Sequence, residues 1–342
     1  MEPAARKEKI LAAIIESYIS TGEPVGSKAL IEQSGLQVSS ATVRNDMAEL
    51  TKRGLIVQPH TSAGRIPTAS GYRYYVDKLL SVEPLARQSR EYILDRLRER
   101  ADSPESILQN AAELLYRLTD CIALATTPDS RDSRIRKISF VQTGAYTAMA
   151  VLICSNGVIK TKLFRCEYLI TPEILGIFDR AMEDTFAGIA VSSVNRPFIQ
   201  TAAARFGELS LLMPTALTAV WEACELAGTV STCHSGFGML MREGDSPLAG
   251  RILEFLQNNR ELSANLEKLP QYTAATIGRE NSRVELAQSA VISTRYLIDG
   301  SPSGVLAVIG PMRLDYSRVF SILEAVSECV SELIGELIRT NP

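Results

Sequence analysis

The amino-acid sequence predicts an α+β fold divided among several domains. Three observations support this prediction: the chain has 342 residues, helical periodicity covers its two ends, and strand-like runs gather in two separate regions between them. A length of this order is typical of two or three domains. Charged residues make up 22% and hydrophobic residues 46% of the chain, an ordinary globular composition.

The first three predicted elements are helices. Segment 7–20 places Ile10, Ile14 and other apolar residues on one face, the spacing of an amphipathic helix. Gly22 and Pro24 end it, and "VGSKALIEQSG" predicts a short second helix capped by Ser27. A third helix begins at Ser39 or Ser40 and stops at Gly54.

A hairpin follows these helices. After Gly54, "LIVQ" predicts a strand, "PHTSAGR" a turn and "IP" a returning strand, and a further helix opens at Thr68. Three helices followed by a β-hairpin are typical of a winged helix-turn-helix.

The remainder alternates between helices and strands. Segment 81–101 mixes arginines with acids, which favours a solvent-exposed connector helix. Asn156-Gly157 and Asp299-Gly300 are hairpin signatures. The predicted elements after the connector are a helix over 105–126, strands over 137–142, 147–157 and 158–167, a helix over 172–186, a mainly helical stretch over 197–269 with a possible hairpin at 229–241, strands over 272–280, 286–300 and 303–312, and a helix over 315–338. This is an α/β domain with three early and three late strands, interrupted by a mainly helical block.

The third helix carries the clearest candidate site. Val43, Met47, Leu50 and Gly54 share one side, and Asp46 and Glu49 lie on a flank. The opposite side consists of Ala41, Arg44, Asn45, Ala48 and Lys52.

Small alanines allow close approach of that side to another surface, and Arg and Asn form bidentate hydrogen bonds with guanine and adenine, respectively. Ser39, Ser40 and Thr42 at the helix start suit a phosphate. The alternative is a solvated helix face without a ligand.

The wing offers a second set of contacts. His60, Thr61 and Ser62 can meet phosphates, and Arg65 can enter a minor groove, where negative potential attracts it. The alternative is an ordinary polar turn. Residues 1–80 contain ten Lys or Arg against eight Asp or Glu, a net charge of +2, so we expect a focused basic patch and a modest salt dependence.

Composition argues against several other classes. The N-terminus is amphipathic rather than a secretory signal, and the apolar runs are too short to span a membrane. The six cysteines are scattered, so we expect reduced, mostly buried thiols and a cytoplasmic location. With two histidines and no catalytic motif, we expect no enzyme and no cofactor. Cys224, Cys233 and His234 fit no common zinc spacing, so we expect no metal.

Longer motifs indicate a family. The runs "ISTGEPVGSKAL", "SSATVRNDMAEL", "GLIVQPHTSAGRIPT" and "GYRYYVDKLL", with "IGRENS" and "GPMRLDYSRV" near the C-terminus, resemble the bacterial heat-inducible transcription repressor family, HrcA. The resemblance spans nearly the whole chain and is thin between about 190 and 270.

The resemblance implies a repressor of the groE and dnaK chaperone operons. It would bind double-stranded DNA at the CIRCE inverted repeat as a homodimer, and the GroEL chaperonin would keep it active. It also implies a winged-helix domain over 1–80, a connector helix over 81–104, a GAF-like domain over 105–169 and 271–342, and an inserted dimerisation domain over 170–270. The implied DNA-reading residues are Ser40, Thr42, Arg44 and Asn45, with wing contacts from His60, Thr61, Ser62 and Arg65.

One alternative keeps DNA binding but makes the GAF-like domain a small-molecule sensor. Asp315, Tyr316 and Arg318 could then line its pocket. The competing interpretation is that "LDYSR" forms the first turn of the last helix, with Asp315 near the positive end of the helix dipole.

Overall fold

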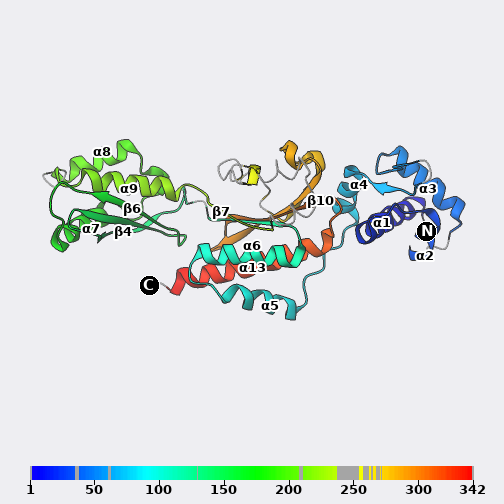
Figure 1. Cartoon of the computed structure of the whole chain (residues 1–342), viewed down its shortest axis with the longest axis horizontal. Coiled ribbons are helices and arrows are strands. Elements are labelled where there is room, and N and C mark those ends of the chain that lie inside the picture. The colour runs from blue at the N-terminus through cyan, green and yellow to red at the C-terminus, as the bar shows by residue number, and fades with distance from the viewer. Residues whose placement is uncertain are drawn as a thin grey trace.

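The computed structural model describes residues 2–34, 38–60, 63–128, 130–207, 211–236, 254–256, 262, 265–266, 270 and 272–340. Its elements form an elongated molecule in which the winged helix and a three-stranded sheet lie at opposite ends of a five-stranded sheet (Figure 1).

The N-terminal part is a winged helix, as the sequence predicts. Its core forms where Ile10, Ile14, Val43 and Leu50 are buried together. Its elements are α1 (Pro3–Thr21), α2 (Ser27–Ser34), α3 (Ser40–Lys52), β1 (Ile56–Val57), β2 (Ile66–Pro67), α4 (Ala69–Tyr74) and a π-helical turn (Tyr75–Leu79).

The central part is a five-stranded sheet in the order β7-β3-β10-β9-β8, with all neighbouring strands antiparallel. Helices α6 and α13 lie side by side on one face, with α5 beside them (Figure 1). Phe255, Leu262 and neighbouring residues pack on the other face. These elements are α5 (Arg87–Arg98), α6 (Pro104–Thr119), β3 (Ile122–Thr126), β7 (Thr232–Ser235), β8 (Ala274–Ile277), 3₁₀ turns Gly278–Glu280 and Val284–Leu286, β9 (Ser289–Ile298), β10 (Ser301–Pro311) and α13 (Tyr316–Thr340).

The third part of the molecule is formed by the segment between β3 and β7, two strands of the central sheet. Its antiparallel sheet has the order β4-β5-β6, and one face packs on α7 and α9 through buried residues such as Phe140, Leu152 and Phe178. Its elements are β4 (Ile135–Gln142), β5 (Thr147–Cys154), β6 (Ile159–Arg165), α7 (Pro172–Phe186), a 3₁₀ turn (Val191–Ser193), α8 (Arg196–Arg205) and α9 (Pro214–Ala227).

Several predicted elements are confirmed. Gly157 and Gly300 have φ of +81° and +77° at the two predicted hairpin turns. Asp315 accepts a hydrogen bond from the backbone N–H of Arg318 at 3.1 Å, so "LDYSR" does start the last helix. Tyr316 is fully buried, whereas Asp315 and Arg318 are exposed.

Two expectations are wrong. The strands at 135–165 do not share a sheet with the late strands; they pair only with each other among the described residues. Alternation along a strand shows that one face is buried, but not which strands are its neighbours. The helix expected over 105–126 ends at Thr119, where Asp120 takes a left-handed φ of +52° and the buried strand β3 follows. Of the hairpin considered at 229–241, only β7 lies within the described residues.

Candidate nucleic-acid interface

Helix α3 begins with a side-chain cap. Ser39 has an extended backbone, and its Oγ accepts a hydrogen bond from the backbone N–H of Thr42 at 3.2 Å. The hydroxyl oxygens of Ser39 and Thr42 lie 2.9 Å apart. Such a cap satisfies one free N–H of the first turn and leaves others available to an acceptor. Gly54, with φ of +73°, allows the sharp turn that ends the helix.

The inner face of α3 is anchored by charge as well as by apolar packing. Asp46 is 4% exposed, and Arg6 of α1 approaches its carboxylate with Nε 2.7 Å from Oδ2. Lys7 of α1 pairs with Glu49. The hydrogen bond with Asp46 raises the pKa of Arg6. Both acids of α3 are therefore neutralised by α1, which leaves the outer face without an unpaired carboxylate of its own.

Asp46 was expected on a flank rather than in the packed interface. The helical wheel placed it beside the buried stripe, and Arg6 makes burial possible because a buried charge needs a partner. The two residues are 40 positions apart in sequence, and only the packing of α1 on α3 brings them together.

The outer face of α3 carries the predicted reading residues. Arg44 and Asn45 are exposed, as are Ala41 and Ala48. The Arg44 Nε donates to Ser27 Oγ at 3.3 Å. Arg44 thus leans toward the start of α2, and within the described part of the chain its guanidinium forms no ion pair with an acid.

Ser27 lies within the candidate site, but sequence reasoning did not assign it there. It begins α2 instead of capping it, and its hydroxyl lies 3.4 Å from that of Ser40. Lys28 beside it is exposed. The signal that could have identified both is their place at a helix start within the helix-turn-helix, the argument applied to Ser39, Ser40 and Thr42.

Lys52 lies apart from the group formed by Arg44, Ser27 and Ser40. It is exposed on the last turn of α3, and the helical rise of 1.5 Å per residue places it about 12 Å along the axis from Arg44. Its position suits the flank of a bound duplex rather than the bases under the start of α3.

The wing is a short antiparallel ladder in which Ile56 pairs with Pro67. His60 is exposed near its tip. Arg65 is half-buried at its base, where Nε donates to Thr51 Oγ1 at 3.3 Å. Thr61 and Ser62 lie outside the described residues.

A close backbone approach fixes the wing on the helices. Arg65 and Val25 exchange two backbone hydrogen bonds, each of 2.9 Å. A Cβ on the adjacent Gly64 would lie 2.5 Å from the Val25 carbonyl carbon, so only glycine fits there. Arg65 is therefore held beside the end of α3, and its entry into a minor groove stays a prediction.

The described residues contain no group of three His, Cys, Asp or Glu side chains arranged to hold a metal. Cys224 lies on α9, whereas Cys233 and His234 lie on β7. No helix in the described part of the chain is both long and apolar enough to cross a membrane.

Comparisons with known proteins agree with this architecture. Residues 13–68 match the model of the DeoR-like helix-turn-helix domain, and residues 105–320 match that of the HrcA protein C-terminal domain. A heat-inducible transcription repressor HrcA of Laribacter hongkongensis is 33% identical, covering 93% of this chain and 92% of the relative. One of Pseudarthrobacter chlorophenolicus is 34% identical, covering 94% and 96%.

A crystal structure described as that of a hypothetical protein has a TM-score of 0.61 and 25% identity, covering 97% of this chain and 98% of its own. The chain thus combines a helix-turn-helix that exposes Arg44 and Asn45 with a C-terminal part whose matched residues, 105–320, make up more than half of the chain. It belongs to the HrcA family of heat-inducible transcription repressors.

Proposed function

We propose that this protein represses groE and dnaK chaperone operons by binding the CIRCE inverted repeat as a homodimer, and that the GroEL chaperonin maintains its active form. The observation that carries the proposal is the outer face of α3, where Arg44 and Asn45 are exposed between small alanines while Asp46 and Glu49 are neutralised by α1. A reading helix needs such a face to enter a major groove.

The residues divide into two roles in this proposal. Arg44 and Asn45 read base edges in the major groove. Phosphate and groove contacts come from Ser39, Ser40, Thr42, Lys52, His60, Thr61, Ser62 and Arg65. The first turn of α3 offers N–H groups to a phosphate because its cap leaves them free.

The Arg44→Ala variant tests the reading role. Loss of a bidentate base contact is expected to cost about 1–3 kcal/mol of specific binding and to relax discrimination at one base position. Arg117→Ala is a matched control, because Arg117 is 69% exposed on α6 and pairs with Glu113 in the same helix. An unchanged ratio of specific to non-specific affinity in Arg44→Ala would refute direct base reading by Arg44.

Several exposed apolar residues on one sheet face support the homodimer. The outer face of β4-β5-β6 places Val141, Met149 and Leu163 in one row across the strands, and Ile153 and Ile159 in another. Val141, Ile159 and Leu163 are 47%, 51% and 60% exposed. The row between them consists of Ser139, Val151 and Thr161, and Lys137 lies opposite Ile153, so polar side chains are interspersed with the apolar ones. Exposed apolar groups gathered on one face are typical of an interaction site.

We therefore propose this face, rather than the helices of the expected 170–270 block, as the dimer interface. The apolar residues of α9 within that block, such as Leu217 and Val220, are buried against the opposite face of the same sheet. The inserted domain of our proposal accordingly spans about 128–231, between β3 and β7, and the GAF-like domain comprises the five-stranded sheet with its helices.

Val151→Asp tests the interface, because Val151 is half-buried in the middle strand of this face. A charge at the centre of an apolar interface is expected to convert the dimer to a monomer, measured by light scattering after size-exclusion chromatography. Val284→Asp is the control, since Val284 is 78% exposed on a 3₁₀ turn of the central part. A Val151→Asp variant that stays dimeric would place the interface elsewhere.

The whole proposal is tested by titrating the protein onto a duplex with the CIRCE repeat and onto a scrambled duplex, with and without chaperonin. Tight binding to the repeat alone, strengthened by chaperonin, is expected. Equal weak binding to both would overturn the operator assignment.

Ligand sensing is the weaker candidate. A cavity of about 240 Å³ lies against the central sheet, lined by residues such as Leu124, Phe255 and Ile309. It is smaller than the roughly 300–1,000 Å³ typical of small-molecule sites. A larger cavity of about 660 Å³ lies at the junction with the winged helix, where Arg73, Asp77 and Glu280 line it, and not within the apolar interior of the central part. We therefore prefer regulation through the chaperonin.

A further inference from the structure

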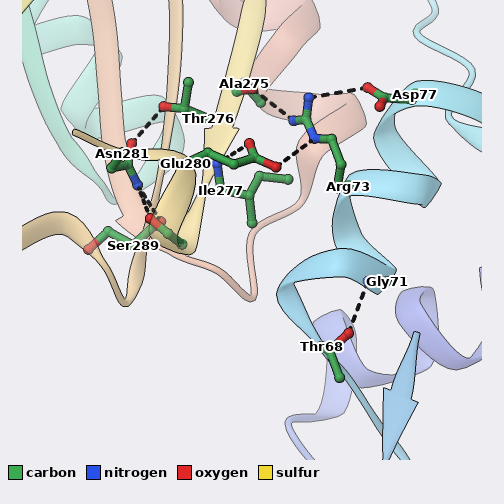
Figure 2. A network of polar contacts seen from close by, with 11 residues as sticks. Thr68, Gly71, Arg73, Asp77, Ala275, Thr276, Ile277, Glu280, Asn281 and Ser289 are labelled. Atoms are coloured by element: carbon green, nitrogen blue, oxygen red, sulfur yellow. Dashed lines mark hydrogen bonds and ion pairs between the residues drawn. The ribbon is translucent and has the colours of Figure 1, made fainter. Parts of the chain in front are cut away.

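The winged helix meets the central part at a polar contact centred on Arg73 of α4. Its Nη2 donates to the Ala275 carbonyl of β8 at 2.7 Å, and its Nε lies 3.3 Å from Glu280 Oε1. Its Nη1 pairs with Asp77 at 3.2 Å (Figure 2). One side chain from the DNA-binding part thus contacts two groups that are more than 200 residues away in sequence.

The acceptor side of this contact is held by hydrogen bonds within its own segment. Glu280 Oε2 accepts from the backbone N–H of Ile277 at 2.9 Å, which holds the carboxylate on its own turn (Figure 2). Asn281 donates to three backbone carbonyls of the same segment and accepts from Thr276 at 2.6 Å. The "IGRENS" motif is therefore a rigid turn that presents Glu280 to α4.

A second contact lies at the end of α1. The Arg313 Nη1 donates to the Ile19 carbonyl at 3.5 Å, where the helix leaves carbonyls without partners. Nearby, Ser317 and Ser321 of α13 donate to carbonyls of the linker that follows the winged helix. The "GPMRLDYSRV" motif thus also faces the winged helix.

Apolar packing also crosses this junction, because buried residues of both parts, such as Tyr75 and Leu314, belong to one core cluster. The rings of Tyr72 and Tyr316 lie with centroids 5.8 Å apart. Beside them, a cavity of about 660 Å³ is lined by Arg73, Ile277, Met312 and neighbouring residues. Domains joined by small, polar interfaces move relative to one another unless specific contacts hold them. Beside this apolar contact, the direction in which α3 points depends on the polar groups that span the junction, among them Arg73 and Arg313.

We infer that Arg73 is a positioning residue that sets the direction of each winged helix and thereby the half-site spacing that the dimer accepts. The inference rests on the proposed binding of an inverted repeat by a homodimer. Two linked winged helices gain affinity only when both bind their half-sites at the same time. The half-site spacing that allows this is a geometric property of the dimer. Arg73 acts through Glu280 and the Ala275 carbonyl and does not touch DNA in this role.

Glu280→Gln gives the sharpest test, because simple electrostatics and the inference predict opposite changes in the affinity for DNA. The amide retains an oxygen for the Ile277 N–H but loses the charge that faces Arg73. Removing an acid would strengthen binding to a polyanion by charge alone. The inference instead predicts that the affinity for the repeat falls by about tenfold, because the two winged helices of the dimer are no longer held in a fixed orientation relative to each other.

The experiment uses the full-length dimer and duplexes whose half-sites are moved apart by one, two and five base pairs. Glu280→Gln and Arg73→Ala are expected to flatten the spacing preference while changing the affinity for a single half-site only by the small effect of one charge. Arg73→Lys, which keeps the charge, is expected to restore part of the preference, and Arg117→Ala to keep all of it. Unchanged spacing preference or tighter binding in Glu280→Gln would overturn the inference.

A DNA-free measurement separates this inference from the proposed function. Spin labels at the exposed positions Lys28 and Gln109 report the distance between the winged helix and α6. Glu280→Gln is expected to broaden that distribution, and an unchanged width would overturn the inference whatever the operator. Failure of the unaltered protein to prefer the CIRCE repeat would overturn the proposed function alone.

Discussion

Among the described glycines of the winged helix, Gly71 leaves the least room for a side chain, so its replacement by alanine should be strongly destabilising. It lies in the first turn of α4, where its N–H donates to the Thr68 Oγ1 cap at 3.1 Å. A Cβ at this position would lie 2.0 Å from the Leu55 carbonyl oxygen and 3.1 Å from its carbonyl carbon. Both atoms belong to the backbone, so no side-chain rotation relieves the contact.

The magnitude follows from the displacement that alanine requires. Carbon and oxygen atoms approach to about 3.3 Å in favourable contacts, so α4 and the chain before β1 must separate by more than about 1 Å. That movement breaks the bond from the Thr68 N–H to the Leu55 carbonyl, now 3.1 Å long. Overpacking and one lost hydrogen bond together amount to about 2–4 kcal/mol of unfolding free energy.

Amide hydrogen exchange of residues 55–79 measures this loss where it occurs. The single tryptophan, Trp221, lies on α9 at the far end of the molecule (Figure 1), so its fluorescence should report an unchanged transition in urea. Gly26→Ala is the control, because its Cβ would meet nothing within 4 Å. Equal protection of α4 in Gly71→Ala and in the parent would refute the steric argument.

Three further changes test other parts of the molecule. Gly176→Ala in α7, where the new methyl group meets nothing within 4 Å, should stabilise that helix by about 0.5–1 kcal/mol, seen as a higher urea midpoint in tryptophan fluorescence. Tyr296→Phe removes a buried hydroxyl that donates to the Thr126 carbonyl at 2.8 Å and should lower the unfolding free energy by about 1 kcal/mol in urea titrations; an unchanged midpoint would contradict this. Burial raises the pKa of Cys154 to about 11 and that of Cys224 to about 12, so both stay protonated at pH 8. A thiol reagent should then leave them unlabelled in the folded protein and modify them in denaturant, as mass spectrometry would show.

Local chemistry in the sequence predicted much of the fold. The Ser39 cap, the glycine after α3 and the turns at Gly157 and Gly300 were identified because each requires a particular backbone geometry. Helical periodicity likewise located α1 and α13.

Contacts between distant segments were not predictable in the same way. The split of the strands into two sheets depends on partners that alternation does not specify. The buried pair of Arg6 with Asp46 and the contact of Arg73 with Glu280 join residues that only the tertiary fold brings together. The exposed reading residues of α3 were predictable, whereas the Ser27 hydroxyl beside Arg44 was not assigned.

The way in which the three-stranded part joins the central sheet makes it a removable module. It leaves at Thr126 and returns at Thr232, and these two residues are direct partners in neighbouring antiparallel strands. Just beyond them, the Thr127 N–H donates to the Ser231 carbonyl at 2.9 Å. A two-residue turn could connect the same pair of strands. The inserted segment of roughly a hundred residues therefore occupies a position that a tight hairpin turn could fill equally well. A segment attached in this way can be gained, lost or exchanged in evolution without changing the register of any strand in the sheet that carries it.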